Sequence, residues 1–322
     1  MRVRERVDVV INAAAGGGGA RELRRLIVRE FQAQGVEVNL LVTRGGARLD
    51  ARARLARESA SRTVVAAGGD GTINAVASAL LGTGKRLGVL PVGTFNYFAR
   101  RLGVPLDVPG AVRTVAEGRV TDVDLCEVNG RIFLNNSSIG LYPSIIRQRE
   151  QEYRRWGRRQ LVAYAAVLRA LLGSGAFMHV RITTAEGVEV DERTPLVFVG
   201  GNPYQLEEFD LPGGRCVRRG DLAIYVARAE GRADLLRLAL QALLRRLRGE
   251  RRLHVLCAGE ALVETRRRRL RVALDGEVVT LRTPLRFRTR PAALKVIVPD
   301  DAAPDGSGPD DPAPEDAGAS GG

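Results

Sequence analysis

Residues 63–81, TVVAAGGDGTINAVASALL, contain a strand signal, a glycine-rich turn and a helix signal in immediate succession. The apolar run Thr63–Ala67 has the length and branched side chains of a buried strand. Gly68–Asn74 adds three glycines and an aspartate, and Ile73–Leu81 has the composition of a helix. Such a turn lets backbone amides and a helix N-terminus approach a phosphate group closely.

The alternation of strand and helix continues on both sides of this segment. Strands are expected at Val7–Asn12, Val36–Thr43 and Leu87–Val92, and helices at Ala20–Gln34 and Ala47–Ser59. A further helical stretch follows the segment 93–97 and ends at Leu102. This alternation predicts a parallel sheet with helices on both faces, and ligands bind at the carboxyl ends of such strands. Three glycine-bearing segments, 12–19, 68–72 and 93–97, follow predicted strands and therefore lie at those ends.

The pattern changes after about residue 120. Asn129-Gly130 between two short apolar runs is a strong hairpin signal. Short alternating segments between 177 and 289 predict an antiparallel β-sandwich, interrupted by helices at 144–172 and 233–247. We therefore expect an α/β domain over residues 1–122, a β-rich domain over 123–299 and a disordered acidic tail over 300–322. The last strand is a candidate to return to the first domain.

The charge of the chain indicates an anionic partner. Its 322 residues carry 50 basic and 37 acidic side chains, a net charge of +13. Seven of the acids lie in 300–322, so the remaining residues carry 50 minus 30, or +20. A nucleotide, an anionic membrane or a nucleic acid would suit this charge. All but two of the basic residues are arginine, which matches phosphate geometry but also accumulates in GC-rich genomes.

Membrane spans and disulfides are not expected. No apolar run approaches the roughly 18 residues that a transmembrane helix requires. The three cysteines, 126, 216 and 257, are far apart in sequence and predict neither a metal site nor a disulfide, so a reducing cytoplasm is the default location.

Asp70 is the principal candidate for binding metal in the glycine-rich turn. An acid inside a phosphate-binding loop is understandable if Mg²⁺ bridges it to the phosphates through water. The alternative is a tight turn in which Asp70 only caps the following helix. Thr94 and Asn96 in the third segment are equally consistent with binding phosphate or ribose and with capping. Asp275-Gly276-Glu277 reads as a hairpin turn, which becomes catalytic only beside the nucleotide.

Taken together, these motifs resemble the diacylglycerol kinase family of lipid kinases, which includes bacterial lipid kinases and the sphingosine and ceramide kinases. The matching pieces lie in the family's order at Val10–Gly19, Gly68–Asn74, Gly93–Arg100, Leu134–Gly140 and Asp275–Glu277. The resemblance covers roughly residues 7–298. It implies a nucleotide-binding domain of the NAD kinase and diacylglycerol kinase type, followed by a lipid-binding β domain.

The resemblance also assigns roles to individual residues. Glu277 is implied as the base that accepts the proton of a lipid hydroxyl, with Asp275 beside it and Asp70 holding catalytic Mg²⁺ through water. The implied ATP contacts are Asn12, Ala13, Ala14, Ala15, Gly16, Thr43, Gly68, Gly69, Asp70, Gly71, Thr72, Ile73, Asn74, Thr94 and Asn96. The expected activity is transfer of the γ-phosphoryl group of ATP to diacylglycerol or a related lipid, as in phospholipid biosynthesis.

The chain departs from the family pattern at three places. Tyr97 stands where the family has aspartate, and alanines replace the proline and serine of the first motif. Arg219-Gly220-Asp221-Leu222-Ala223 lacks both acids of the family's structural magnesium motif, so we do not expect that metal. These departures keep a catalytically silent lipid- or nucleotide-binding regulator as an alternative. A kinase of a soluble substrate, as in NAD kinases, is a second alternative.

Basic segments indicate contact with a membrane surface. The predicted helix 144–172 combines the six arginines within 147–159 with Tyr153, Trp156 and Tyr164, a composition typical of helices on anionic headgroups, although a solvated basic face is equally consistent. Arg266–Arg269 is a second candidate. We expect a cytoplasmic protein that binds the inner face of the membrane peripherally and does not bind nucleic acid. A homodimer is left open.

Overall fold

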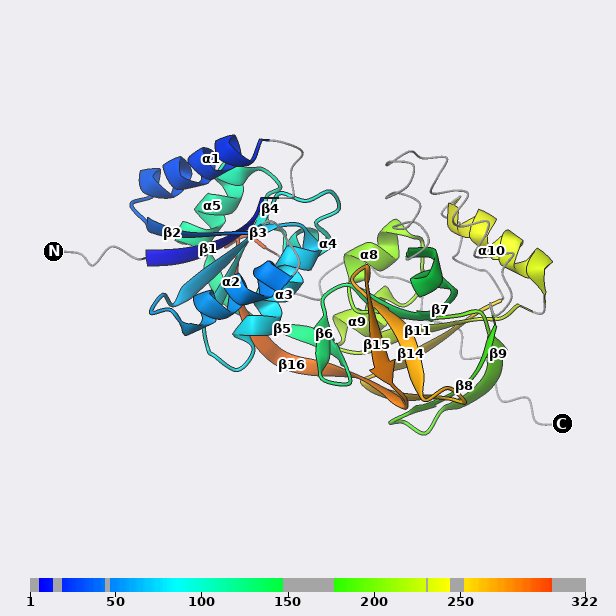
Figure 1. Cartoon of the computed structure of the whole chain (residues 1–322). Helices are drawn as coiled ribbons and strands as arrows, with labels where there is room; N and C mark the ends of the chain where they lie inside the picture. The colour runs from blue at the N-terminus through cyan, green and yellow to red at the C-terminus, as the bar shows by residue number, and fades with distance from the viewer. Residues whose placement is uncertain are drawn as a thin grey trace. The chain divides into compact units, whose positions relative to one another are not determined.

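The computed structural model describes residues 6–13, 19–43, 47–146, 177–229, 231–243 and 252–302 (Figure 1). They form two compact units. The first unit comprises the described residues within Met1–Asn135 together with Asp275–Glu277 and Thr289–Asp305. The second comprises those within Asn136–Leu274 together with Val278–Arg288. Residues 123–135 thus lie in the first unit, whereas the sequence places the domain boundary after residue 122.

The first unit is built on a parallel sheet with the strand order β2-β1-β3-β4-β16. Helices α1 and α5 cover one face, and α2 and α3 cover the other (Figure 1). The strands are β1 (Arg6–Asn12), β2 (Glu37–Thr43), β3 (Thr63–Gly68), β4 (Arg86–Pro91) and β16 (Leu285–Val298), joined by the hairpin β5 (Arg119–Val128) and β6 (Arg131–Phe133). The helices are α1 (Ala20–Ala33), α2 (Ala47–Glu58), α3 (Asp70–Leu80), α4 (Tyr97–Arg101) and α5 (Val108–Glu117). The predicted α/β class is confirmed.

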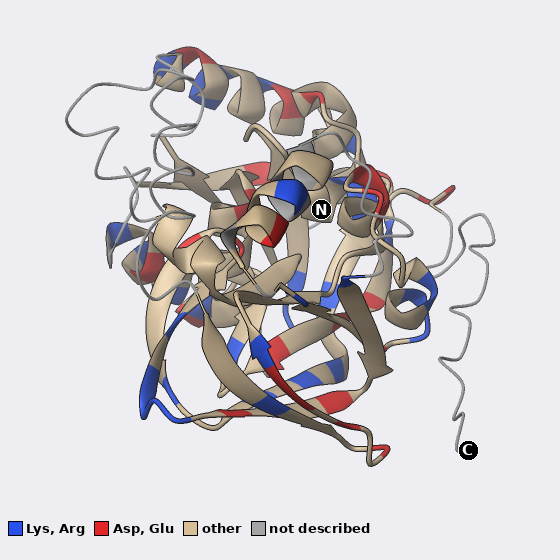
Figure 2. Ribbon diagram, turned by 90° about the vertical axis from the view of Figure 1, so that its right-hand side faces the viewer, with Lys and Arg blue, Asp and Glu red and all other residues tan. Residues whose placement is uncertain are grey.

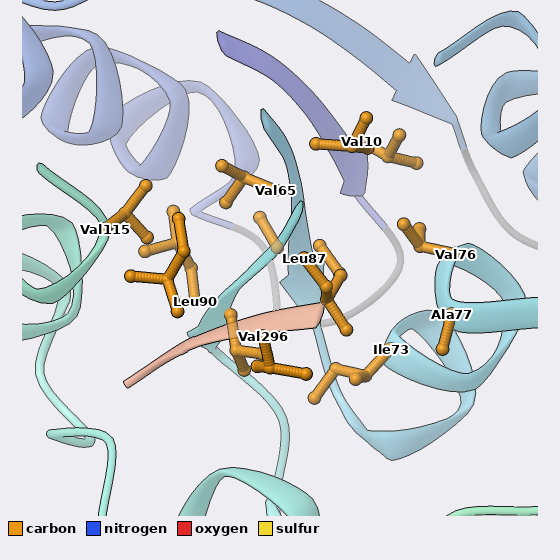
Figure 3. Packing of buried hydrophobic residues seen from close by; sticks show 14 of the residues in the cluster. Val10, Val65, Ile73, Val76, Ala77, Leu87, Leu90, Val115 and Val296 are labelled. Atoms are coloured by element: carbon orange, nitrogen blue, oxygen red, sulfur yellow. The ribbon is translucent and has the colours of Figure 1, made fainter. Parts of the chain in front are cut away.

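Buried aliphatic residues explain why these strands lie at the centre. All six residues of β3 are buried, which matches the continuous apolar run expected of a strand covered on both faces. Figure 3 shows Leu87 and Val296 near Ile73 of α3, and Val65 near Val115 of α5. This packing holds the ends of the central strands in fixed positions.

The second unit is mainly antiparallel. Its six-stranded sheet has the order β12-β11-β10-β7-β14-β15, and a second ladder runs β16-β13-β8-β9. The strands are β7 (Asn136–Gly140), β8 (Met178–Thr184), β9 (Glu189–Thr194), β10 (Leu196–Gly200), β11 (Leu222–Ala227), β12 (Leu253–Ala258), β13 (Glu260–Thr265), β14 (Arg269–Leu274) and β15 (Glu277–Arg282). The helices are α8 (Pro203–Glu208), α9 (Gly214–Arg218) and α10 (Arg232–Leu243). The expected antiparallel β architecture is confirmed.

Some elements differ from the sequence-based expectation. β9 (EVDERT) was not expected because charged residues dominate it, yet it pairs along β8 as an outer strand. The short helices α8 and α9 carry too few turns to produce a periodic signal. Residues 141–146 are helical, but most of the predicted helix 144–172 falls in 147–176 and lies outside the described residues.

The expectation of three unpaired cysteines is wrong for two of them. Cys216 in α9 and Cys257 in β12 form a disulfide, with Cα atoms 5.6 Å apart and a sequence separation of 41. The fold brings α9 against the edge of the six-stranded sheet, a proximity that sequence spacing does not reveal. Cys126 is a free, buried thiol, and burial raises its pKa to about 12.

Basic and acidic residues are interspersed along the described ribbon (Figure 2). Within the described part of the chain, no helix is both long enough and apolar enough to cross a bilayer. All four residues of Arg266–Arg269, between β13 and β14, are exposed. The other basic segment, the part of the predicted helix within 147–164, lies outside the described residues.

Candidate functional site

The loops after β1, β2 and β3 are joined at the carboxyl edge of the parallel sheet. The Ala13 backbone N–H donates to the Thr43 carbonyl oxygen over 2.7 Å, which links the ends of β1 and β2. The Asn12 side-chain amide donates to Thr72 Oγ1 over 3.4 Å, which links β1 to the start of α3. Of the first predicted segment, Asn12 and Ala13 are described, whereas Ala14, Ala15 and Gly16 lie outside the described residues.

The glycines after β3 and β4 allow two loops to touch backbone to backbone. A Cβ atom placed on Gly93 would lie 2.4 Å from Gly69 Cα, a distance that no side chain tolerates. A Cβ on Gly68 would lie 2.3 Å from Thr72 Oγ1. Glycine is therefore required at position 93 by the close approach of the two loops, and at position 68 by the Thr72 side chain that packs against it.

Asp70 connects three segments through its carboxylate. The backbone N–H groups of Tyr97 and Phe98 donate to it over 3.3 and 3.0 Å, and the Asn135 side-chain amide donates over 3.2 Å. Asp70 thereby fixes the start of α4 and the segment before β7 relative to the glycine loop. A carboxylate offers about four lone-pair directions, so one direction stays available to a water molecule or ion.

Asn96 shapes the loop between β4 and α4. Its backbone is left-handed, with φ of 54°, and its side chain accepts from Gly93 N–H over 3.1 Å. The same amide donates to the carbonyls of Gly93 and Pro91 over 3.0 and 3.4 Å. These bonds occupy a side chain that the sequence also allows as a phosphate ligand. Thr94, in contrast, is exposed.

The remaining predicted contacts belong to the first turn of α3. Gly71 is half-buried and Thr72 is buried, with its hydroxyl next to Asn12. The side chain of Ile73 is fully buried in the hydrophobic core, so only its backbone is near the loops. Asn74 points instead toward the acidic turn.

The acidic turn Asp275-Gly276-Glu277 is a tight hairpin between β14 and β15. Asp275 and Gly276 have φ of 47° and 88°, both in the left-handed region that such a turn requires. The Asp275 carboxylate accepts from Asn74 Nδ2 over 2.5 Å and from the backbone N–H groups of Leu134 and Asn135 over 2.7 and 2.8 Å. Asp275 therefore attaches the turn to α3 and to the segment that follows β6.

Glu277 lies beside the glycine loop. Its Oε1 would be 3.7 Å from a Cβ atom on Gly71, and its side chain is exposed. The structure thus places Asp70 in the same unit as Asp275 and Glu277, which follow it by more than 200 residues in sequence. An exposed carboxylate next to a phosphate-type loop is suitably placed to accept a proton from an approaching hydroxyl.

A cavity of about 520 Å³ lies beside β2, the edge strand of the parallel sheet. It is lined by Val42, Thr43, Arg48, Ala51, Arg52 and Leu55 from β2 and α2. Thr43 is 4% exposed, and its hydroxyl has no hydrogen-bond partner among the described residues. A buried hydroxyl without a partner is costly unless a ligand or water satisfies it. This volume is in the range of small-molecule sites.

Metal-binding groups are sparse. The described residues contain no group of three or more His, Cys, Asp or Glu side chains that could hold an ion. Such a donor set suits Mg²⁺ only where phosphate oxygens and waters supply most of its ligands, with Asp70 in contact through water. Asp221 is partly buried in the second unit, and desolvation raises the pKa of its carboxyl above the ordinary value.

Two features of this site were missed by sequence reasoning. Asn135 lies in a recognised motif but was not assigned to the site, although it contacts both Asp70 and Asp275. Arg48 and Arg52 were seen only as part of an arginine-rich helix. Their helical spacing of four residues places them on one face, but which face borders a cavity is decided by packing.

The fold and this edge define a class: a two-unit α/β and β protein whose glycine loops and acidic turn meet at the end of a parallel sheet. Residues 6–128 match the model of the diacylglycerol kinase catalytic domain, so the resemblance seen in the sequence is confirmed for this part.

Curated relatives carry lipid kinase names. A probable YegS-like lipid kinase from Cronobacter sakazakii is 38% identical over 134 residues, which are 39% of this chain and 43% of the relative. A diacylglycerol kinase from Staphylococcus epidermidis is 31% identical over 140 residues, covering 43% of this chain and 44% of the relative. The matches therefore span less than half the length of these relatives.

Solved structures extend the likeness of fold to nearly the whole chain. A putative diacylglycerol kinase from Bacillus anthracis superposes with a TM-score of 0.73 at 24% identity, covering 93% of this chain and 99% of that one. At this identity the match establishes the fold of both units and leaves the chemistry to the residues of this chain.

Proposed function

We propose that this protein is an ATP- and Mg²⁺-dependent lipid kinase that phosphorylates the hydroxyl of diacylglycerol or a closely related lipid. The observation that carries the proposal is the position of Glu277 beside Gly71 in a turn attached to α3 through Asp275. In this proposal the nucleotide-binding domain lies within residues 1–122, and the β-rich domain for the lipid substrate lies within residues 123–299.

The proposed reaction is an in-line phosphoryl transfer. The acceptor oxygen forms a bond to the γ-phosphorus of ATP, the bond from that phosphorus to the β–γ bridging oxygen breaks, and ADP leaves. Glu277 accepts the hydroxyl proton as the new bond forms. Bound Mg²⁺ would neutralise charge on the phosphates.

The chain's own residues position the reactants. The glycine loops offer backbone N–H groups to phosphate oxygens, because side chains are excluded where Gly69 and Gly93 meet. Asp70 and Asn96 hold the loop containing Thr94 in one conformation. Asp275 holds the turn containing Glu277, so the base is placed before any substrate binds. In this assignment Asp275 is a positioning residue.

The cavity beside Thr43 is the candidate site for the nucleoside end of ATP. It adjoins the end of β1 through the hydrogen bond from Ala13 to Thr43. Val42, Ala51 and Leu55 offer apolar contacts to a base. Arg48 and Arg52 bring positive charge to the same cavity.

Radiolabelled ATP with vesicles carrying a panel of lipids tests the proposed activity. Label should move to diacylglycerol or a relative, and Glu277→Gln should lower the rate by roughly 10²–10⁴-fold, the usual contribution of a general base. Glu186→Gln, which alters an exposed glutamate in the β8–β9 turn, is the matched control and should leave the rate unchanged. ATP binding without transfer to any lipid would instead favour a silent regulator, and transfer to NAD a soluble-substrate kinase.

We also propose that the protein works at the inner, anionic surface of the membrane. The exposed run Arg266–Arg269 supports this, because arginines near an anionic surface each add about 1 kcal/mol of attraction. Sedimentation with phosphatidylglycerol vesicles should decline as salt rises. Equal sedimentation with neutral phosphatidylcholine vesicles would contradict the proposal. Light scattering on the protein without vesicles would establish whether it is a homodimer.

A further inference from the structure

An exposed aromatic side chain stands next to the proposed site without any assigned role. Phe95, between β4 and α4, is 61% exposed, a larger fraction than any other large hydrophobic side chain in the described part of the chain. Its ring lies parallel to that of Tyr97, with centroids 5.5 Å apart and an interplanar angle of 3°. Tyr97 is only 8% exposed, so it forms a fixed support on which the Phe95 ring rests.

The loop that carries Phe95 is held in place on both sides. Asn96 closes it through hydrogen bonds to Gly93 and Pro91. Asp70 accepts the backbone N–H of Tyr97, and Arg100 Nε donates to the Phe95 carbonyl over 3.1 Å. The exposure of the phenyl ring is therefore a consequence of a fixed backbone. A fixed, exposed aromatic ring beside a site offers a broad apolar surface to a bound molecule.

The strand order indicates where the Phe95 ring lies relative to a bound nucleoside triphosphate. The ends of β2, β1, β3 and β4 follow one another across the sheet, so about 14 Å separates the first from the last at roughly 4.8 Å per strand. The cavity of Val42 and Leu55 is at β2, and the glycine loops are at β1 and β3. A nucleoside triphosphate whose base occupies that cavity directs its γ-phosphate toward β3 and β4.

Phe95 consequently lies on the side of the γ-phosphate where the acceptor must approach, on the far side of the glycine loops from the base cavity. We propose that the Phe95 ring, supported by Tyr97, binds the apolar part of the lipid acceptor next to its reacting hydroxyl. This inference rests on the proposed lipid kinase activity. An aromatic ring suits an acyl or glycerol backbone, because it offers a broad apolar surface with little loss of side-chain entropy.

Steady-state kinetics of paired variants test the proposal. In Phe95→Ala, the KM for dispersed dioctanoylglycerol should rise roughly tenfold, the loss expected for one aromatic contact, while the KM for ATP stays within about twofold. Leu55→Ala should show the reverse, a raised KM for ATP alone. Phe95→Tyr should restore the acceptor KM. Leu106→Ala, which truncates an exposed leucine elsewhere in the same unit, should change neither constant.

A raised KM for ATP in Phe95→Ala with an unchanged acceptor KM would overturn the proposal and indicate that the ring stacks on the nucleobase. Calorimetric titration of dioctanoylglycerol and of ATP separates this inference from the proposed activity. If the wild-type protein transfers no phosphate but binds dioctanoylglycerol, and Phe95→Ala weakens that binding alone, the activity fails while the contact is upheld. Equal lipid binding by both proteins, or none by the wild type, would refute the contact.

Discussion

The two units fix their functional and surface loops by different means. In the first unit, hydrogen bonds to the carboxylates of Asp70 and Asp275 hold the glycine loop, α4 and the acidic turn together. In the second unit, a covalent bond between Cys216 and Cys257 ties α9 to β12. The first arrangement depends on charge and geometry, whereas the second depends on redox conditions. Substitution of a carboxylate and addition of a reductant should therefore affect different parts of the molecule.

Asp275→Ala, in the first unit, should lower the free energy of unfolding the most. It leaves three donors without their acceptor, two of them backbone N–H groups, and it places alanine in a left-handed turn. At about 1–3 kcal/mol for each unsatisfied donor, we expect the free energy of unfolding to fall by about 4 kcal/mol, measured by urea denaturation. Asp275→Asn tolerates the turn and keeps one acceptor oxygen, so it should lose about half as much. Equal stability of Asp275→Ala and wild type would mean that these bonds do not hold the turn.

Loss of the disulfide, in the second unit, should cause the second largest loss of stability. Opening a loop of 41 residues relaxes the unfolded chain, and the expected cost is about 3 kcal/mol. The Cys216→Ala/Cys257→Ala variant should unfold at lower urea concentration than the oxidised wild type. Reductant should weaken the wild type to the same extent and leave the double variant unchanged. A wild type that is insensitive to reductant would show that the disulfide does not stabilise the second unit.

Asp70→Asn should have an intermediate effect on the first unit. The new amide keeps one acceptor oxygen but turns an NH₂ group toward one of its former donors, at a cost of about 1–2 kcal/mol. Because the Phe95 loop depends on this carboxylate, the acceptor KM should rise together with the loss of stability. Denaturation of Asp70→Asn and Asp107→Asn, a helix-capping aspartate away from the site, provides the comparison. A loss of stability without any change in the acceptor KM would show that the Phe95 loop does not depend on Asp70.

Asp221→Asn should have the smallest effect on stability, and it should stabilise the protein instead of destabilising it. Desolvation, with a contribution from Glu186 and against the influence of Arg219, raises the pKa of the Asp221 carboxyl in the folded protein. The stability that this group contributes is present below its unfolded pKa and is lost as pH rises through the folded one. The variant should therefore melt about 1–2 °C higher at pH 7, and the difference should vanish near pH 3. A lower melting temperature at pH 7 would contradict the role of burial.

The elements that could be predicted from the sequence are those with strong local signals. The apolar run of β3 and the hairpin at Asn129–Gly130 depend on the properties of adjacent residues, and both appear where expected. Strand β9 and the short helices α8 and α9 have weak local signals, and their formation depends on neighbouring elements. The same distinction applies to the site: the glycine loops could be predicted, but the contacts of Asn135 could not.

The sequence by itself determined the α/β class and the positions of the glycine loops at strand ends, because these follow from local composition and spacing. Only the tertiary structure decided that Asp275 accepts a hydrogen bond from Asn74, 201 positions away in sequence, and that Cys216 forms a disulfide with Cys257. It also decided that the exposed Phe95 ring stacks on the ring of Tyr97. Those facts arise from packing between distant segments, and the energy of a packed contact is not encoded in the residues next to it in the chain.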